Sequence, residues 1–463
     1  MDLEKRARRQ SLKIIVSEFI MVITVIITVV ILAFLVSGYW LGSGFKVERQ
    51  GMLQIYSTPT GANVAVDGDA PWYQRTNTSK ILSSGEHEII LTKDGYDSWR
   101  KTVSINEGLL YRVHYPRLFL LEREKSTAFS PTKAPSFATI SPDYNSMLLI
   151  DNTTSWTLLN LNRDEIEPTA IDVSAIFTFV SKADGAVSGL FTGKIISANW
   201  SNDNEHVLLQ VDSDDGLAEE WVVLNVKNPK NSVNITREFA ADFDAVRIFD
   251  SSASTLLALG DGNLRKIDIT SRQISAILAE DVKSYDFYES DLIYFSDNKI
   301  FAGKLNDPKT IILTEVEDDS RVLVSKFYDE KYNFVISKNK VELMKQDNFE
   351  LVFEDELSFV PETLKIGQGG SFIFMQNDTN VAVLDMEIMT IREWQLDSVN
   401  YGWLDSSMLY AVKDGVLIVY DFDGLNRREL SNNVSARFPV TIVNNKWLYY
   451  FSDDALVREV IAQ

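Results

Sequence analysis

The feature that most constrains this chain is a long apolar stretch close to its N-terminus. No charged residue occurs between Phe19 and Phe45, and about 20 apolar residues in a helix are enough to cross the roughly 30 Å hydrocarbon core of a bilayer. Basic residues precede the stretch and usually stay in the cytoplasm; they are Lys5, Arg6, Arg8, Arg9 and Lys13. The sequence therefore predicts a cytoplasmic basic tail over residues 1–13, a transmembrane signal anchor over residues 14–45, and a body outside the membrane.

A cleaved signal peptide is the other interpretation of the same stretch. The apolar run is far longer than the roughly 7–15 residues of a typical signal-peptide core, and no A-x-A-like cleavage site follows it, although residues 37–38 and 42–44 are small. We therefore expect a single-pass protein of the cell membrane, with a cytoplasmic N-terminus and an extracytoplasmic C-terminal body. Thr24 and Thr28, spaced i,i+4, could mark a helix-packing face, but we expect ordinary contact with lipid.

Composition bounds what the body can be. The chain has 463 residues, and the part beyond the anchor has room for two or three domains at about 150 residues each. Its formal charge of -21 predicts a soluble acidic surface that repels nucleic acid, so DNA and RNA are not expected partners. The absence of cysteine excludes disulfides, thiolate nucleophiles and every zinc site that uses cysteine.

The first segment of the body, residues 51–108, has the pattern of a small all-β sandwich. Two alternating runs between Met52 and Gly68 are joined by a turn that contains proline and glycine, and Asp67-Gly68 is a strong hairpin signal. The alternation returns at Ser84–Leu91 and at Lys93–Ile105, again with glycine in the turns.

The turns and strand entries of this segment carry a set of motif residues: Ser57, Pro59, Gly61, Ala62, Asp67, Gly68, Gly85, His87, Gly95 and Tyr96. In these residues the segment resembles the PEGA domain family. Thr60 stands where the naming motif has glutamate, and Ala70-Pro71 where Thr-Pro is usual. The resemblance implies an extracytoplasmic, often membrane-proximal sandwich that mediates surface or envelope contacts, and it implies no catalysis.

Two features of this segment have both a functional and a structural interpretation. Trp72 and Tyr73 could form an exposed platform for sugars, but aromatic side chains bury large areas, so we expect them to cover one edge of the sandwich core. His87 and His114 lie within strand patterns, without neighbours at metal-binding spacing, and are expected to be structural.

The remainder, residues 111–463, is built of repeats. Ala138–Ile150 and Ser197–Leu209 share an entry strand, a turn rich in Asp, Asn and Ser, and an apolar strand. The pattern recurs in about eight units at roughly 40-residue spacing, which is typical of four-stranded propeller blades. Seven blades are the alternative, because the first two units carry insertions at Ala170–Lys194 and Asp212–Glu220.

The last repeat lacks an outer strand. We expect Arg117–Glu124 to supply it and so to close the ring, and we expect Thr127–Pro135 to be a loop. Ser141-Pro142-Asp143 and Asp421–Gly424 are similar to turns of TolB-type, WD-like propeller repeats. That resemblance implies the architecture of residues 125–463 and no particular ligand.

Motifs that carry chemistry are few. Neither a G-x-S-x-G elbow nor a phosphate-binding glycine loop occurs, and the chain has three histidines. Asp212–Gly216 suggests calcium, but Gly216 and Val223 fall where ligands are needed, which favours a solvated hairpin tip. Carboxylates are too abundant for any pair to be diagnostic of glycoside hydrolysis, and we interpret the Asn-x-Ser/Thr triplets as chance; they begin at positions such as Asn77, Asn152 and Asn234.

These observations predict no catalytic residue, cofactor or metal ligand, and they leave the binding residues unknown. The expected role is binding or scaffolding, with a propeller head presented to envelope proteins or cell-wall polymers and with the bilayer contacted by the N-terminal helix. The alternative is a cell-envelope hydrolase or lyase with its site at the propeller face.

Overall fold

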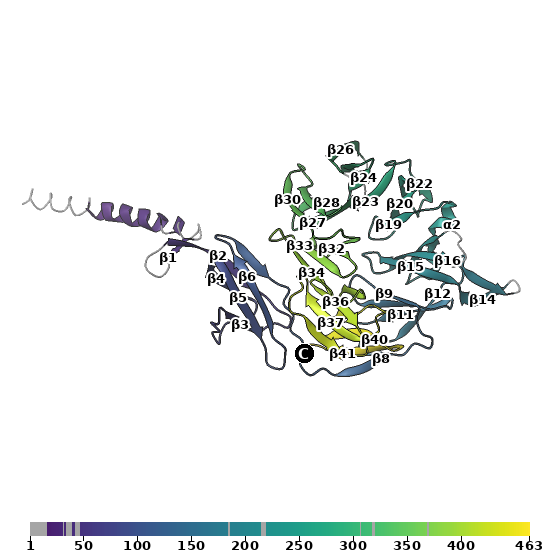
Figure 1. Cartoon of the computed structure of the whole chain (residues 1–463), viewed down its shortest axis with the longest axis horizontal. Helices are drawn as coiled ribbons and strands as arrows, with labels where there is room; N and C mark the ends of the chain where they lie inside the picture. Colours follow the sequence, from purple (N-terminus) through teal and green to yellow (C-terminus); the bar gives the residue numbers. More distant parts are fainter. Residues whose placement is uncertain are drawn as a thin grey trace, which may run out of the picture. The chain divides into compact units, whose positions relative to one another are not determined.

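The computed structural model describes residues 16–30, 32–33, 39–41, 47–183, 186–213, 219–305, 307–316, 320–367 and 370–463 (Figure 1). The chain divides into two compact units, Met1–Glu122 and Arg123–Gln463, and each is described by itself.

The N-terminal segment of the first unit is a helix followed by a strand. Residues 16–30 are helical, and β1 (Tyr39–Leu41) pairs antiparallel with the start of β2 (Val47–Ile55). Within the described residues, no helix combines the length and the apolar character needed to cross a membrane. The predicted anchor over residues 14–45 is therefore not supported, and at residues 39–41 the helix was the wrong prediction because Tyr39 and Trp40 favour extended backbone. The predicted tail, residues 1–13, lies outside the described residues.

Beyond β1 the first unit consists of two small sheets. The first joins β1, β2, β4 (Thr78–Ser83) and β7 (Leu110–Val113), and the second joins β3 (Asn63–Val66), β5 (Gly85–Thr92) and β6 (Trp99–Ile105). Burial alternates along β6, as expected for a strand with one face on a core. The core is formed by fully buried side chains from both sheets, among them Leu53, Ile55, Ile89, Leu91 and Trp99.

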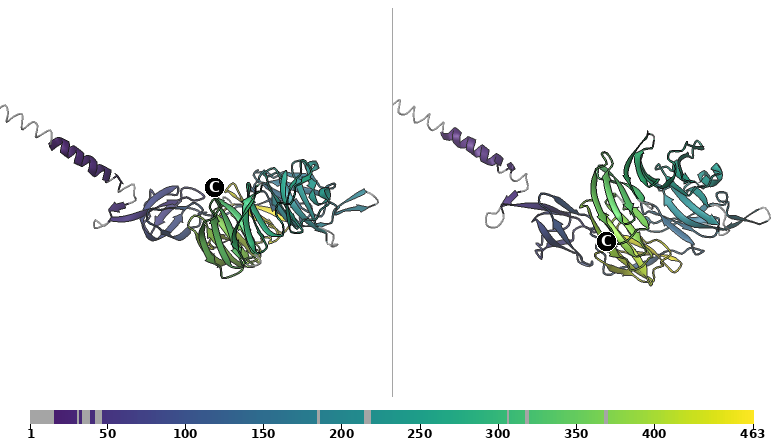
Figure 2. Two further views of the ribbon diagram at one scale, coloured as in Figure 1. Left: turned by 90° about the horizontal axis from the view of Figure 1, so that it is seen from above. Right: turned by 45° about the horizontal axis from the view of Figure 1, so that its top comes forward.

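The second unit is a ring of sheets that we number as blades. Within its described residues there are eight four-stranded sheets, so the count is eight and not seven, and they follow one another around the ring (Figure 2). Blade 1 is β9 (Phe137–Ile140), β10 (Ser146–Ile150), β11 (Ser155–Asn160) and β12 (Pro168–Asp172); blade 2 is β15 (Gly193–Trp200), β16 (His206–Ser213), β17 (Glu220–Asn225) and β18 (Val233–Asn234). Blade 3 is β19 (Ala245–Ile248), β20 (Thr255–Gly260), β21 (Asn263–Asp268) and β22 (Gln273–Ile274); blade 4 is β23 (Val282–Tyr288), β24 (Asp291–Ser296), β25 (Lys299–Lys304) and β26 (Asp307–Glu315).

The other four blades repeat the same meander. Blade 5 is β27 (Arg321–Phe327), β28 (Glu330–Ser337), β29 (Lys340–Lys345) and β30 (Leu351–Glu356); blade 6 is β31 (Thr363–Ile366), β32 (Phe372–Asn377), β33 (Asn380–Asp385) and β34 (Thr390–Gln395). Blade 7 is β35 (Tyr401–Trp403), β36 (Met408–Lys413), β37 (Val416–Asp421) and β38 (Arg428–Ser431); blade 8 is β39 (Thr441–Val443), β40 (Trp447–Ser452), β41 (Ala455–Val460) and β8 (Lys125–Phe129). Outside the blades lie the hairpin of β13 (Val180–Ala183) and β14 (Ala186–Phe191), the 3-10 turn η1 (Pro229–Asn231) and the short helix α2 (Ile235–Phe239).

The middle strands of the blades are buried on both faces because each sheet packs between two neighbours. All six residues of β17 and the first five of β36 are buried. Three of the two-residue turns between middle strands have positive φ at both central positions, which explains why these three read Asp-Gly or Asp-Asn. Asp261-Gly262, Asp297-Asn298 and Asp414-Gly415 have this conformation.

The ring is closed by a strand from the start of the second unit. β8 pairs antiparallel with β41, and blade 1 packs against blade 8 through a cluster that includes Met147, Leu159, Tyr449 and Phe451. Closure was expected around Arg117–Glu124; the closing strand instead begins at Lys125, and of the expected segment Glu124 takes part through its carbonyl, which accepts from the N–H of Val460 at 2.9 Å.

The physical reason is that the apolar residues of that segment belong to the first unit. The backbone N–H of Leu118 donates to the carbonyl of Thr58, and the N–H of Phe119 donates to Asp97 Oδ1 at 2.7 Å. The true closing strand, β8, gives little apolar signal because most of its residues are exposed.

Candidate functional site

One end of the ring carries several networks of hydrogen-bonded polar side chains. In an antiparallel meander the first and third turns lie at the same end of the sheet, so these turns of all blades share one face. We call this the turn face and define it by the described residues of the eight first turns, 141–145, 201–205, 249–254, 289–290, 328–329, 367 with 370–371, 404–407 and 444–446, together with the third turns beside them.

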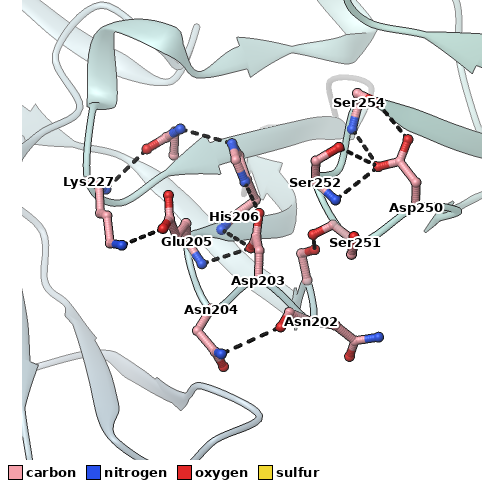
Figure 3. A network of polar contacts seen from close by, with 12 residues as sticks. Asn202, Asp203, Asn204, Glu205, His206, Lys227, Asp250, Ser251, Ser252 and Ser254 are labelled. Carbon is pink, nitrogen blue, oxygen red and sulfur yellow. Dashed lines mark hydrogen bonds and ion pairs between the residues drawn. The ribbon is translucent and has the colours of Figure 1, made fainter.

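Aspartates organise the turns of blades 2 and 3 (Figure 3). Asp203 accepts hydrogen bonds from the N–H groups of Glu205 and His206, and Asp250 accepts from Ser252 and Ser254 through both N–H and hydroxyl groups. Burial opposes ionisation of both aspartates, but these hydrogen bonds prevail and hold each pKa below its usual value. Both carboxylates are therefore occupied by their own turns.

His206 is fixed by the same network. Its Nδ1 lies 2.6 Å from Asp203 Oδ2, and its Nε2 lies 2.9 Å from the side-chain nitrogen of Asn225. The Asn225 oxygen already accepts from two backbone N–H groups, so the side-chain nitrogen of Asn225 is the atom that faces the ring. A histidine with both nitrogens engaged is not a free base.

Contacts between blades tie the turn face together. The N–H of Asp143 in blade 1 donates to Asn204 of blade 2, and the hydroxyl of Ser201 in blade 2 donates to the carbonyl of Ser251 in blade 3. Burial and the charge of Asp405 in blade 7 raise the pKa of Tyr144 in blade 1 to about 12. The face is thus ordered before any ligand arrives.

A cavity of about 550 Å³ opens on this face between blades 4 and 5. It is built from the first turn of blade 5, the third turn of blade 5 and the facing strands β24 to β26 of blade 4. Its walls mix charge, amide and apolar groups: Asp291, Ala302, Gly303, Lys304, Ile311, Asp329, Glu330, Lys331, Lys345, Gln346, Asp347 and Phe349.

Asp291 is the buried centre of the cavity's charges. It forms ion pairs with Lys304 and, at 2.9 Å, with Lys331, and its side chain is only 2% exposed. Burial opposes ionisation of Asp291, yet the two lysines lower its pKa. The hydrogen bond from Lys331 to Glu289 is the main reason that the pKa of Lys331 is raised.

A second buried carboxylate links the first strands of three blades. Asp286 of blade 4 lies 2.5 Å from Arg247 of blade 3 and accepts a hydrogen bond from the N–H of Val324 in blade 5 at 2.8 Å. Burial raises the pKa of Asp286, with Arg247 and Val324 acting against this. Arg247 also donates to the carbonyl of Tyr285. These contacts of Asp286 and Arg247 join blades 3, 4 and 5.

The aromatic pair of the first unit does not lie where we expected it. Trp72 is 86% exposed and Tyr73 is 72% exposed, and their rings meet edge to face with centroids 5.9 Å apart. The prediction that they cover the core edge is wrong because Val64 and Val66, on the neighbouring strand, already fill it. Hydrogen bonds between Val66 and Asp69 and from Gln74 to Pro71 hold the loop backbone that presents them.

Of the remaining candidates, His87 pairs with Asp67 at 2.6 Å and His114 lies against Tyr115. The segment Asp212–Gly216, for which a solvated hairpin tip was favoured over a calcium site, has residues 214–216 outside the described residues. In the part of the chain that the structure describes, no group of three or more histidine, aspartate or glutamate side chains could hold a metal ion.

Comparison with known proteins identifies a PEGA domain at residues 50–117, which confirms the resemblance inferred for residues 51–108. No curated protein sequence matches the chain. The WD40 domain of Sif2 is similar at 12% identity over 73% of this chain and 98% of that domain, with a TM-score of 0.47.

Two further structures are similar to the same degree. The β-propeller domain of Cps50 from Myceliophteria thermophila has 9% identity, covers 73% of this chain and 100% of that chain, and has a TM-score of 0.41. PorZ, a surface component of the type-IX secretion system of Porphyromonas gingivalis, has 12% identity over 71% of this chain and 42% of that chain, with a TM-score of 0.41. Scores this low add nothing to the architecture seen in the sheets themselves.

Proposed function

We propose that this protein is a membrane-anchored, extracytoplasmic binding or scaffold protein whose ring engages envelope proteins or cell-wall polymers. The observation that carries the proposal is the turn face of the ring, where hydrogen bonds order the turns of blades 1, 2 and 3 and a cavity opens between blades 4 and 5. Ordering a surface in advance lowers the entropic cost of binding a partner. The PEGA domain supports the same role.

The proposed location rests on the N-terminal segment. Large apolar side chains of residues 16–30 are exposed all round the helix, for example Phe19, Met21 and Ile26. The hydroxyls of Thr24 and Thr28 donate to backbone carbonyls four residues earlier, at 2.8 Å, so they need no water. Together with the basic residues before it, such a segment suits a lipid environment with the ring outside.

A topology experiment tests the location. Protease added to intact cells should degrade the ring and leave only an N-terminal fragment, and a reporter fused after Gln463 should be active only if it functions outside the cytoplasm. A cytoplasm-specific reporter that is active at Gln463 would contradict the proposal.

The exposed aromatic pair favours a second mode of contact, through the PEGA domain. Trp72 and Tyr73 offer ring faces on a loop held by its own backbone hydrogen bonds, which suits stacking on the sugars of an envelope polymer. Binding of purified cell-wall polymer should fall when both residues are replaced by alanine. Unchanged polymer binding would restrict the proposed function to the ring.

Site-specific photocross-linking in native membranes tests the main proposal without removing any part of the chain. A photoreactive residue at Tyr328, in the first turn of blade 5 and 60% exposed, should capture a defined envelope protein. The same group at the exposed Asp454, in the second turn of blade 8 between β40 and β41 and so at the opposite end of the ring, is the matched control and should capture none. Equal capture at both positions would contradict a specific turn face.

An enzymatic role, as a hydrolase or lyase acting at the ring face, is the competing proposal. The assay is turnover of envelope glycans and peptides by the purified full chain. Activity that survives purification and is lost on substitution of turn-face carboxylates would establish it.

A further inference from the structure

We propose that the cavity between blades 4 and 5 binds a basic side chain, an arginine or lysine of a partner protein. This deepens the proposed binding function and depends on it. It commits the site to one chemistry: a cation carried on an aliphatic stem.

The first step is the balance of charge in the cavity. Its three lysines are already matched: Lys304 and Lys331 contact Asp291, Lys331 also contacts Glu289 at 2.6 Å, and Lys345 lies 3.4 Å from Glu330. Asp291 is buried beneath them, so an anionic ligand would have to displace a carboxylate that has no room to leave. The lysines therefore do not make this an anion site.

The second step is that two carboxylates and one amide oxygen in the lining of the cavity have no partner among the residues that the structure describes. Asp329 and Asp347 both line the cavity and are exposed, and neither has a hydrogen bond or ion pair with any residue in the described part of the chain. The side-chain oxygen of Gln346, another residue of the lining, is buried and also lacks a donor within the described residues. All three unsatisfied groups are hydrogen-bond acceptors, and two of them are carboxylates, so the capacity that the lining leaves unused is for a donor with positive charge.

The third step is the rigidity of these acceptors. The N–H of Gln346 donates to the carbonyl of Lys331 at 2.8 Å, which ties the third turn of blade 5 to the strand that follows its first turn. In the same third turn, the N–H groups of Lys345 and Phe349 each take part in a hydrogen bond within residues 345–350. The two turns that carry Asp329 and Asp347 are therefore held at a fixed separation.

The fourth step is the apolar part of the lining. Ile311, which is 51% exposed, and Phe349 both line the cavity. A lysine or arginine buries its aliphatic stem on such groups while its charged end reaches carboxylates, and a guanidinium is also attracted to an aromatic face. The volume of about 550 Å³ leaves room for one side chain and the backbone beside it.

The test measures binding of short fluorescent peptides to the full chain in detergent. One blocked peptide carries a central arginine, and its partner carries citrulline, which has the same shape but no charge; a third carries glutamate. We expect the arginine peptide to bind about tenfold or more tighter than the citrulline peptide, and the preference to weaken with added salt.

Matched variants locate the site. The double substitution Asp329→Asn and Asp347→Asn should abolish the arginine preference, whereas Asp453→Asn with Asp454→Asn, at the exposed turn between β40 and β41, changes the net charge equally and should leave it unchanged. Asparagine keeps the size of each side chain, and both variants must show the unfolding transition of the native chain. An equal loss in both variants would show that only overall charge matters and would overturn the proposal.

Other outcomes also decide against it. No detectable binding of the arginine peptide, equal binding of the citrulline peptide, or tighter binding of the glutamate peptide each refutes a basic side chain as the ligand. Competition by free spermidine at lower concentration than the peptide would assign the cavity to a small cation instead of a partner protein. Capture at Tyr328 is read independently, so the wider proposed function can survive each of these results.

Discussion

The PEGA domain and the ring are both all-β, but different kinds of interaction hold them together. The PEGA domain has one apolar core, with Trp99 fully buried at its centre. The ring has an apolar cluster at one blade interface after another, and it also places buried carboxylates between blades or at its closure: Asp286, Asp291 and Glu459.

This difference predicts which kind of substitution destabilises each unit. A domain of about 70 residues buries a smaller fraction of its surface than a large domain does and is only marginally stable, so loss of one large core side chain removes most of its stability. A ring of packed blades spreads its apolar contacts widely, but a buried charge that loses its partner costs several kcal/mol at a single point. Apolar substitutions should therefore break the PEGA domain, and charge substitutions should break the ring.

The largest expected effect is at Trp99. Replacement by alanine should lower the free energy of unfolding of the PEGA domain by about 3–5 kcal/mol. The reason is that the indole of Trp99 is fully buried and packs edge to face on Tyr115, with ring centroids 6.1 Å apart. Hydrogen-exchange mass spectrometry on β5 and β6 measures this in the full chain.

Trp72 is the matched control, since it is the same residue type in the same domain but 86% exposed. Trp72→Ala should change stability by no more than about 0.5 kcal/mol. If the two substitutions destabilise β5 and β6 equally, the assignment of Trp99 as the core and Trp72 as a surface residue is wrong.

The second expected effect is at the closure of the ring. Glu459 is fully buried and is contacted by Arg123 at 2.5 Å, Lys125 at 3.4 Å, Ser431 at 2.5 Å and Tyr450 at 3.1 Å. Glu459→Ala should cost about 3 kcal/mol in the ring, since it leaves Arg123 without its carboxylate at the strand that closes the last blade.

Exchange in β40 and β41 should accelerate in this variant, with β5 and β6 unchanged. Glu165→Ala, at an exposed position of blade 1, should have no measurable effect. Faster exchange in both units would show that they unfold together, contrary to the comparison drawn above.

The repeating parts of the fold could be predicted from the sequence because they depend on local rules. Period-2 alternation and Asp-Gly or Asp-Asn turns act within about ten residues, and they gave the sandwich, the meanders and the count of eight. The prediction of the closing strand failed because it required a choice between residues 117–124 and Lys125–Phe129. That choice depends on which unit buries Leu118 and Phe119, and this is decided by long-range contacts.

The cavity was beyond prediction for a related reason. Its lining spans Asp291 to Phe349 across two blades, and sequence alone marks Asp329 and Asp347 only as turn residues. Whether a carboxylate is free or occupied by its own turn, as Asp203 is, depends on neighbours that only the folded ring supplies. The adjacent pair Trp72 and Tyr73 was visible, but its exposure depended on which residues already filled the core edge.

The smallest expected effect is a pH dependence confined to the PEGA domain, at His87. Its Nδ1 lies 2.6 Å from Asp67 and its Nε2 lies 2.9 Å from the carbonyl of Ser83, so both ring nitrogens face acceptors. Burial opposes protonation, but the hydrogen bond to Asp67 and the carbonyl raise the pKa of His87 above 6.5, and His87 in turn lowers the pKa of Asp67 below 3.8. The stabilisation is fully present below about pH 6.5, is lost as pH rises through the folded pKa of His87, and is lost at the acid end as pH falls through the folded pKa of Asp67.

His114 acts in the opposite sense, since desolvation and the nearby charge of Arg112 lower its pKa. The neutral form of His114 is favoured in the folded domain, so His114 lowers the stability of the domain below about pH 6.5. Because the His114 side chain is exposed, we expect its effect to be smaller than that of His87. In the full chain with His114→Gln, protection of β5 and β6 should fall by about 0.5–1 kcal/mol between pH 6 and pH 8, whereas His87→Gln should remove that fall and leave a slight rise. Protection that falls equally with pH in both variants would show that neither histidine sets it, and a matching change in β40 and β41 would show that the pH response does not belong to the PEGA domain.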